Sequence, residues 1–524
     1  MPDPLKPSPE RRPWLIVAAV ALVAVLLVVE ANRGGDTRPL PPTPAQPKAK
    51  PGAPGIAGVA RVDPFAYRAE DDAEFLRRGR DGLAHVLYTK SPGGAEATAA
   101  RTARWRGLAQ KAAARYGVDA STIEAIVFVE SAGRPDVEAG GNPDSAVGLA
   151  QILPGTATSL LGMRVDLPRS LRLAQRLARA RHIATAARRA RVRRRAQGQV
   201  AALLALRPRI DQRYDPRASL DGAARYLAFA QHKLGRPDLA TASYHMGVGN
   251  LQNVIDAYVS PRPRSHTTRA TVARYGITYP RLYFDSSPVR NPMAYRRLYG
   301  LGDDSRHYLF KVEAARDILR MFSSGKVDEL RRIAQLQTAK ASQENLLRPE
   351  DEYPPYKDGT ALRRAYASGD LVGLPDSPRR FGYTIDRGMG SLARQVHEKR
   401  TLFRGLRPEA LATLIYITKE VRSAAGGSHL RVTSTVRDLK YQRALVGVNI
   451  QATREFSLHT TGYAFDIERS FRNRREAAAL VATLERLRAL DVIDWVYEPA
   501  AIHVTAGPEA KALVPLLDRL IVRP

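Results

Sequence analysis

The chain has 524 residues, a hydrophobic content of 44% and a formal net charge of +30. This length exceeds one ordinary core, so we expect two or three domains, and the composition is that of a globular rather than a disordered protein. The chain contains no cysteine, which excludes a cysteine nucleophile, a thiolate zinc site and a disulfide framework, so His, Asp or Glu must bind any metal.

The N-terminal region predicts a membrane anchor. Basic residues precede an uninterrupted apolar run, Trp14 to Val29, which can pair its backbone groups as a helix in lipid. The basic flank favours a single span with the rest of the chain on the extracytoplasmic side. The alternative is a secretory signal peptide, with the protein secreted after cleavage near Ala31. The apolar run is slightly shorter than the ~20 residues that a membrane-spanning helix takes.

A helix predicted at Thr122–Ser131 carries the first candidate catalytic residue. Asp119 or Ser121 can cap its start, and its last turn reads Val-Glu-Ser. Glu130 is thus a carboxylate at the end of a mostly apolar helix, where burial would raise its pKa and suit it to general acid catalysis. On its own, a Glu at a helix end is more often simply solvated.

Further motifs follow Glu130 in a fixed order. They are Gly148–Ala157 (GLAQILPGTA), Asp215–Leu227 (DPRASLDGAARYL), Ala242–Asn250 (ASYHMGVGN) and His307–Val312 (HYLFKV). With Glu130-Ser131 they resemble the bacterial lytic murein transglycosylases, which have a goose-type-lysozyme-like SLT domain, over residues 100–335. Ala150 and His245-Met246 depart from this pattern, since the family usually has Met and Asn-Ala there.

The resemblance implies an all-α lysozyme-like domain that acts on peptidoglycan without a cofactor. Glu130 would protonate the glycosidic oxygen and then deprotonate the muramoyl C6 hydroxyl, leaving 1,6-anhydro ends. Gln151, Tyr244 and Ser131 would bind the substrate. One carboxylate suffices in such enzymes because the N-acetyl group of the substrate replaces the second carboxylate of ordinary glycosidases. A lysozyme-type hydrolase and a wall-binding scaffold with inactive sites are the alternatives.

An arginine-rich insertion, residues 163–213, separates two of these motifs. Its apolar spacing favours a helical hairpin, which is either simply solvated or binds anionic wall polymers or lipid headgroups. No helix-turn-helix, zinc-finger or RNA-binding signature accompanies the positive charge, so nucleic acid is not expected as a partner.

A second set of candidate residues lies near the C-terminus. We predict a helix at Pro408–Ala424, a strand at Leu430–Val436 and, after a turn at Gly462, a strand at Tyr463–Ile467. The turn can bring Asp466 back beside His459. A strand pair, 494–498 with 502–505, would place Glu498 beside His503. Two His and one Asp with an open position form a catalytic zinc arrangement, although the spacing of His459 and Asp466 alone is weakly specific.

The motif Ser457–Ile467 (SLHTTGYAFDI), with Arg437 before it, resembles the zinc D-alanyl-D-alanine carboxypeptidases, which share their fold with the hedgehog signalling domain. The resemblance covers residues 400–510. It implies a small α+β domain in which His459, Asp466 and His503 bind zinc, Glu498 activates water and Arg437 holds the peptide carbonyl or a substrate carboxylate. In many relatives the Glu stands closer to its His than Glu498 does to His503.

Taken together, these patterns predict a multidomain enzyme of the cell membrane that remodels peptidoglycan on both its glycan and its peptide. The predicted domains are residues 1–32 (anchor or signal), 33–99 (Pro-rich linker and pre-domain segment), 100–335 (lytic transglycosylase), 336–399 (connector) and 400–524 (zinc carboxypeptidase-like).

Overall fold

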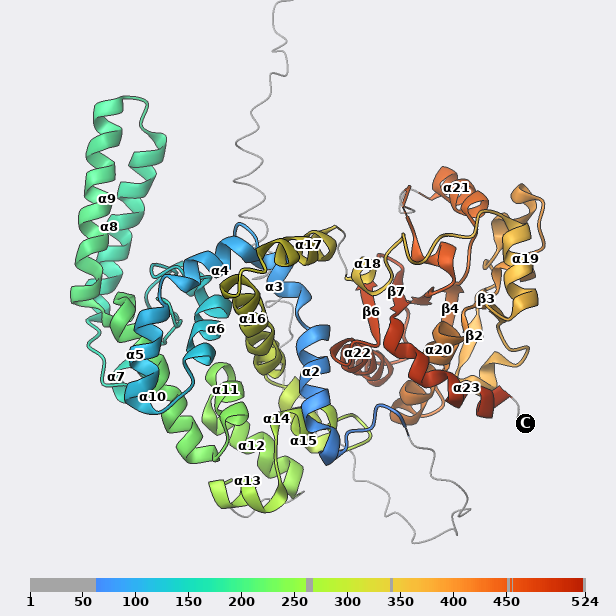
Figure 1. The fold of residues 1–524 in the computed structure, drawn as a ribbon, viewed down its shortest axis with the longest axis horizontal. Helices are drawn as coiled ribbons and strands as arrows, with labels where there is room; N and C mark the ends of the chain where they lie inside the picture. The colour runs from blue at the N-terminus through green and yellow to red at the C-terminus, as the bar shows by residue number, and fades with distance from the viewer. Residues whose placement is uncertain (1–62, 261–266, 340–342, 450–452, 455, 522–524) are drawn as a thin grey trace, which may run out of the picture. The chain divides into compact units, whose positions relative to one another are not determined.

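The computed structural model describes residues 63–521 except 261–266, 340–342, 450–452 and 455 (Figure 1). The chain divides into two units, Met1–Arg61 and Val62–Pro524, and all described residues belong to the second. The predicted anchor at Trp14–Val29 therefore lies outside the described residues. Within the described part of the chain, none of the helices is both long and apolar enough to span a membrane.

The first part of the described chain, up to residue 338, is mostly helical (Figure 1). Its α-helices are α2 (Asp72–Gly82), α3 (His85–Lys90), α4 (Ala95–Ala103), α5 (Arg106–Tyr116), α6 (Ala120–Ser131), α7 (Pro154–Ser159), α8 (Leu167–Ala186), α9 (Ala190–Ile210), α10 (Pro216–Leu234), α11 (Pro237–Met246), α12 (Val248–Val259), α13 (Arg269–Tyr275), α14 (Tyr279–Phe284), α15 (Pro292–Tyr299), α16 (Tyr308–Ser323) and α17 (Val327–Thr338).

Helix α6 lies at the centre of this helical part. The Asp119 carboxylate accepts hydrogen bonds from the backbone N–H groups of Ser121 and Thr122, which begins the helix two residues before the predicted start. Every residue from Thr122 to Phe128 is buried, and α6 packs against α4, α5, α10 and α16. A helix that is mostly apolar has to be enclosed, and α6 therefore carries Glu130 to the edge of a core.

The arginine-rich insertion forms the predicted helical hairpin, α8 and α9, which extends away from the other helices (Figure 1). Leu173, Leu177, Ala180 and Leu203 fill the seam between its two helices. The hairpin thus has an apolar seam of its own, and its remaining faces are left to water.

A buried ion pair at the base of the hairpin organises the loop that carries Gln151. Arg213 is fully buried and donates to both carboxylate oxygens of Asp211 at 3.0 and 2.8 Å. Its remaining N–H groups donate to the carbonyl oxygens of Pro143, Ser145 and Ile152. Gly148 fits against this turn with a φ of +81°, where a Cβ would overlap the Arg213 carbonyl oxygen.

The C-terminal part contains a sheet of five strands in the order β2 (Tyr383–Ile385), β4 (Leu430–Ser434), β5 (Ala464–Glu468), β7 (Ala501–Ala506) and β6 (Ile493–Tyr497). The β2–β4 pair is parallel and the other pairs are antiparallel. The other elements of this part are α18 (Glu344–Leu347), α19 (Gly359–Ser368), the short pair β1 (Val372–Gly373) and β3 (Gly405–Leu406), α20 (Pro408–Ala425), α21 (Leu439–Val448), α22 (Arg474–Ala489) and α23 (Val514–Ile521).

This sheet begins earlier in the chain than the predicted boundary at residue 400. Strand β2 lies in the predicted connector, yet it pairs with β4 through Tyr383 opposite Leu430. The connector also contains α19 and β1. The sequence predicted only a connector here, but pairing with residues distant in the sequence decides the structure.

Side-chain alternation gives the two faces of the sheet different roles. Phe465 and Ile467 of β5, and Ile502 and Val504 of β7, belong to the core that includes α20 and α22. Because neighbouring strand residues point to opposite faces, the residues between them lie on the other face of the sheet. Asp466 is directly opposite His503 in the β5–β7 register, so their side chains are neighbours on that face.

The helical part and the sheet share one hydrophobic core within the second unit. Phe75 of α2, Phe284 of α14 and Phe310 of α16 belong to the same cluster as Leu484 and Leu487 of α22. An ion pair between Arg306 and Glu485, at 2.9 Å, also joins the two parts.

The first described residues also pack against the C-terminal part. The Phe65 ring meets the Tyr416 ring of α20 edge-on at 6.3 Å. The Arg486 guanidinium of α22 donates to the Phe65 carbonyl oxygen. The predicted linker and pre-domain segment, residues 33–99, thus includes folded chain from residue 63 onward.

We expect Arg213→Gln to destabilise the fold by roughly 3 kcal/mol, because it leaves the buried Asp211 carboxylate without its cation. Arg209→Gln is the matched control, since Arg209 is an exposed arginine nearby on α9. The midpoint of denaturant unfolding measures the difference. Equal midpoints for the two variants would contradict a structural role for the Arg213–Asp211 pair.

Candidate functional site

Glu130 occupies the next-to-last position of α6, and its side chain is partly exposed. Tyr308, the first residue of α16, donates its hydroxyl to the Glu130 carboxylate at 2.6 Å. Burial of the carboxyl group raises the pKa of Glu130, while the Tyr308 hydrogen bond and electrostatic interactions with His245 and Lys311 oppose that rise. The carboxyl group can therefore hold a proton at a higher pH than an ordinary Glu.

Two aromatic rings form one wall beside Glu130. The Tyr244 ring of α11 stacks on Tyr308 with a centroid distance of 6.2 Å and an interplanar angle of 8°. Its hydroxyl donates to the Ala150 carbonyl oxygen at 2.8 Å. This bond ties the wall to the loop that carries Gln151 and fixes the orientation of both rings.

Of the two other predicted substrate-binding residues, Gln151 is partly exposed and Ser131 is buried. Gln151 adopts a φ of +45° in the loop after Gly148, and its amide donates to the carbonyl oxygens of Val137 and Gly148. Gln151 is only partly buried, so it can also contact a ligand. Ser131 is buried, and its hydroxyl donates to the Val127 carbonyl oxygen of its own helix.

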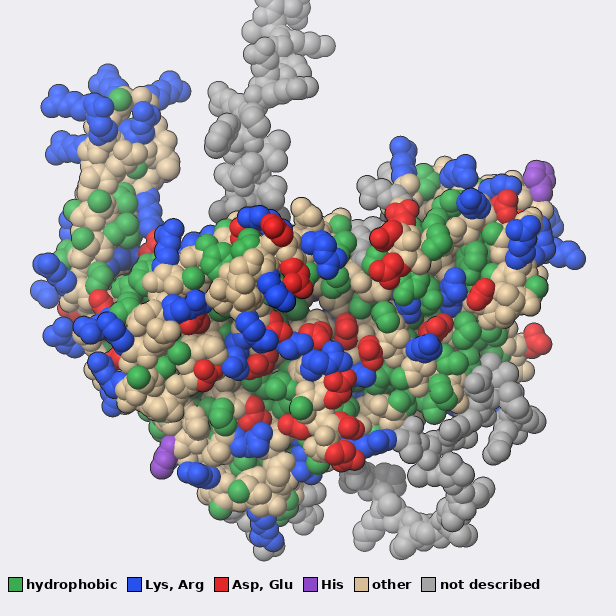
Figure 2. Space-filling model, viewed as in Figure 1, with side chains coloured by type: hydrophobic (Ala, Val, Ile, Leu, Met, Phe, Trp, Pro, Cys, Tyr) green, Lys and Arg blue, Asp and Glu red, His purple; other side chains and the backbone are tan. Residues whose placement is uncertain are grey.

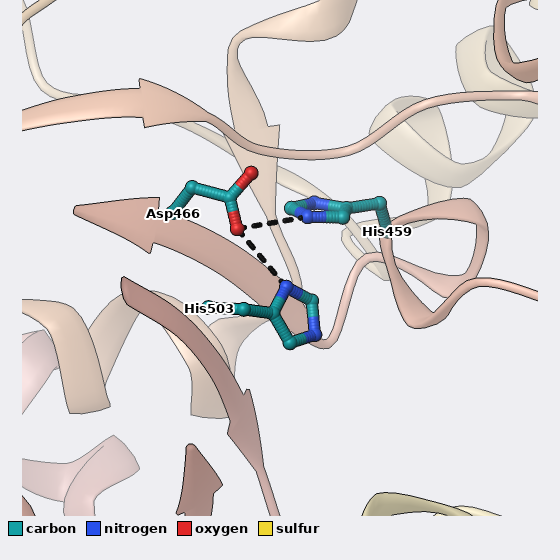
Figure 3. Close-up of side chains that lie close together, drawn as sticks. All are labelled: His459, Asp466 and His503. Atoms are coloured by element: carbon teal, nitrogen blue, oxygen red, sulfur yellow. Dashed lines mark hydrogen bonds and ion pairs between the residues drawn. The ribbon is translucent and has the colours of Figure 1, made fainter. Parts of the chain in front are cut away.

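A second group of titratable side chains lies on the sheet face opposite the core (Figure 3). Atoms of His459, Asp466 and His503 that can ligate a metal all lie within 4.8 Å of one another. The Asp466 Oδ1 atom is 3.1 Å from His459 Nε2 and 3.0 Å from His503 Nδ1. His459 precedes β5 on a short 3₁₀ helix, Leu458–Thr461, and the turn at Gly462 returns the chain to Asp466.

The outer nitrogens of both imidazoles are also hydrogen-bonded. His459 Nδ1 is 2.9 Å from the Thr435 carbonyl oxygen, and His503 Nε2 is 3.1 Å from a Glu344 carboxylate oxygen. Histidine ligands of metals normally donate their other ring N–H to a carbonyl or carboxylate, which turns the free nitrogen toward the metal. The donor set of the described residues therefore fits a metal ion held by His459, Asp466 and His503.

The pKa values follow from these contacts. Burial lowers the pKa of His459 to about 4, so this imidazole is neutral and able to act as a ligand. Burial would also lower the pKa of His503, but its hydrogen bonds to Asp466 and Glu344 outweigh burial and raise the pKa to about 10. A metal at His503 Nδ1 would compete with this proton, so metal affinity should fall as the pH falls.

Arg437 contacts Asp466, whereas Glu498 influences the site only through its charge, since Val496 and not Glu498 stands opposite His503 in the register. The Arg437 guanidinium is 3.5 Å from the second carboxylate oxygen of Asp466 and donates to Ser434 and Gln442. Glu498 directly follows β6, and its N–H donates to Ala501 in the turn that leads into β7. Glu498 is an exposed residue. Partial desolvation of its carboxyl group and the negative charge of Asp466 raise the pKa of Glu498, whereas His503 and Arg437 oppose the rise.

Comparison with known proteins assigns part of the helical region. Residues 107–178 match the transglycosylase SLT domain. This match spans α5, α6, α7 and the first part of α8, so Glu130 and Gln151 both lie within the SLT match. It does not reach the tip of the hairpin or the C-terminal sheet.

Two curated relatives, both named endo-type membrane-bound lytic murein transglycosylase A, come from two strains of Klebsiella pneumoniae. Each is 39% identical to this chain over 70 residues, which is 13% of this chain and 33% of the relative. The chain thus spans about one third of the length of the curated relatives that it matches.

Three residues near the two sites were not selected from the sequence. Tyr308 stands in the motif His307–Val312, one of those that resemble the lytic transglycosylases, and its position there was the available signal. Lys311, one turn later on α16, has its pKa lowered to about 8 by burial, which the charge of Glu130 opposes. Glu344 carries no sequence signal, because only the fold brings its connector segment beside His503.

We expect Tyr308→Phe to raise the pKa of Glu130 further, because it removes a hydrogen bond that favours the charged carboxylate. Titration of the Glu130 carboxyl group by ¹³C NMR, assigned by loss of its signal in Glu130→Gln, measures the change. Tyr226→Phe is the control, since the Tyr226 hydroxyl donates to the Ser243 carbonyl instead. A lower or unchanged pKa in Tyr308→Phe would contradict this account of the site.

Proposed function

We propose that the helical part of the chain is a peptidoglycan lytic transglycosylase that cleaves the MurNAc–GlcNAc bond and leaves 1,6-anhydro ends. The observation that carries the proposal is the Glu130 carboxyl group, which burial holds toward its protonated form at the end of α6 and which lies within the SLT match. The names of the two relatives support peptidoglycan as the substrate.

In the proposed reaction, protonated Glu130 donates its proton to the glycosidic oxygen as the bond from that oxygen to C1 breaks. The N-acetyl group of the substrate stabilises the positive charge at C1. The Glu130 carboxylate then accepts the proton of the C6 hydroxyl, whose oxygen bonds to C1 and closes the anhydro ring. Glu130 ends protonated as it began, and no water is consumed.

The surroundings of Glu130 suit both halves of this cycle. Burial favours the protonated carboxyl group that begins the reaction. The Tyr308 hydroxyl favours the carboxylate that forms in the middle, because it donates to the carboxylate. A lysozyme-type hydrolase is the main alternative; water would then attack C1 and leave a free reducing end.

We expect Glu130→Gln to reduce glycan cleavage by at least about 100-fold, because an amide cannot deliver the proton. Mass spectrometry of digested peptidoglycan measures both the amount and the ends of the fragments. Glu124→Gln is a matched control on the same helix, since Glu124 pairs with Arg106. Free reducing ends from the unsubstituted chain would instead indicate a hydrolase, and cleavage by Glu130→Gln at the normal rate would exclude Glu130 as the acid.

We further propose that the C-terminal part is a zinc peptidase that acts on the D-amino-acid-containing stem peptide of peptidoglycan. The support is the convergence of His459 Nε2, Asp466 Oδ1 and His503 Nδ1, with both outer imidazole nitrogens already hydrogen-bonded. Zinc bound there would supply Lewis acidity to a peptide carbonyl and to water. A wall-binding domain without peptidase activity is the alternative.

The other residues around this cluster would act on the substrate directly. Glu498 would accept the proton of the attacking water and return it to the leaving amine. Arg437 would donate hydrogen bonds to the carbonyl oxygen or to the terminal carboxylate of the peptide. Its bonds to Ser434 and Gln442 hold the guanidinium in one orientation for that task.

We expect the full chain to bind one zinc ion and to shorten stem peptides in a chelator-sensitive way. His459→Ala should abolish both, while Glu498→Gln should abolish cleavage and keep the metal, because Glu498 is not proposed as a ligand. Calorimetry and elemental analysis measure zinc, and mass spectrometry measures the peptides. The control is His232→Ala, which removes an exposed His of α10. Zinc binding by His459→Ala at normal affinity would exclude this site.

We propose that the protein acts at the cell membrane, with both sites on the extracytoplasmic side. The apolar run Trp14–Val29 and the membrane-bound designation in the names of the two relatives support this location. Peptidoglycan would then be the substrate of both parts of the chain.

A further inference from the structure

The loop end of the α8–α9 hairpin carries a dense cluster of basic side chains (Figure 2). We call it the arginine tip, and all of its members are exposed: Arg188, Arg189, Arg191, Arg193, Arg194 and Arg195. Residues 167–210 contain neither Asp nor Glu. Other hairpin arginines do have acidic partners, such as Arg181 with Asp136 and Arg207 with Glu138. In the part of the chain that the structure describes, no side chain of the arginine tip has one.

This cluster does not stabilise the hairpin. Arg191 and Arg193 lie in the first turn of α9, where the positive end of the helix dipole disfavours a cation. Neighbouring guanidinium groups at helical spacing also repel one another. An external anion would relieve both effects.

Two aliphatic side chains lie exposed beside the arginine tip. Ile183 on α8 and Val192 on α9 are each 44% exposed, and each is within about one turn of the connecting loop. The hairpin contains no Phe, Tyr or Trp, which are the side chains on which nucleic acid bases stack. Apolar side chains set among arginines suit a surface where anionic headgroups border hydrocarbon.

We propose that the arginine tip, with Ile183 and Val192, docks onto the surface of an anionic phospholipid bilayer. The guanidinium groups donate paired hydrogen bonds to the lipid phosphodiesters. The two aliphatic side chains enter the boundary between headgroups and acyl chains. A soluble anionic polymer offers the phosphates but no apolar phase, so the aliphatic pair distinguishes lipid from polymer.

The absence of cysteine from the chain allows a single reporter to be placed at the arginine tip. The full-length chain carrying Ala190→Cys is labelled with a fluorescent dye and mixed with vesicles of phosphatidylcholine alone or with phosphatidylglycerol, each containing a headgroup quencher. Any membrane segment near the N-terminus is present in both cases, so the comparison isolates the effect of lipid charge. Ala367→Cys, an exposed alanine near the end of α19, is the matched control position.

We expect the dye at residue 190 to be quenched about threefold or more in phosphatidylglycerol vesicles relative to neutral ones, and raised salt to weaken this difference. The dye at residue 367 should show no such difference. In the Ala190→Cys background, R191Q/R194Q/R195Q should remove the difference, whereas R296Q/R297Q/R332Q, with the same loss of charge at exposed sites, should retain it.

The variant I183S/V192S keeps every charge and should weaken quenching while leaving binding to soluble polyphosphate unchanged. Circular dichroism checks that each variant is folded. Equal quenching in the two kinds of vesicle would overturn the proposal. A second result would also overturn the proposal: polyphosphate binding depends on the arginines, and I183S/V192S does not alter quenching by vesicles. The arginine tip would then recognise a soluble polyanion rather than a bilayer.

Discussion

A charged group that is removed from water must be paired inside the protein, and both candidate sites of this chain depend on that requirement. The Arg213 guanidinium donates hydrogen bonds to Asp211 and to backbone carbonyl oxygens, and these bonds fix the loop that carries Gln151. The Asp466 carboxylate lies between two imidazoles. Among the described residues, the Tyr308 hydroxyl donates to Glu130 but does not offset the effect of burial, which raises the pKa of Glu130. That raised pKa would suit Glu130 to the general acid role that we propose.

Local patterns in the sequence predicted much of the fold. Helix α6 begins at the predicted Asp119 cap, and the insertion forms the predicted hairpin with Leu177 in its seam. The predicted strands around Asp466 and His503 are also confirmed, with those two residues directly opposite in register. Period-two alternation and a turn at Gly462 were sufficient to place these side chains together, because they depend on short-range geometry.

Features that depend on long-range packing could not be predicted from the sequence. Glu344 reaches His503 across 159 residues of sequence, and nothing in a four-residue helix signals that contact. The pairing of β2 with β4 was hidden in a connector that is rich in proline. The role of Arg213 is likewise invisible, because three of its partners are backbone carbonyls, and every residue type presents the same carbonyl group.

The contact of Phe65 with α20 has a consequence for how the chain can be divided. Residues 63–82 enter the core shared by α16 and α22. The C-terminal part therefore packs against the first described residues of the chain as well as being joined to α17 through the backbone. A single proteolytic cut near residue 341 would therefore leave the fragments associated. To separate the fragments, Phe65 and Phe75 would have to leave the core, and exposing their apolar surface to water costs free energy.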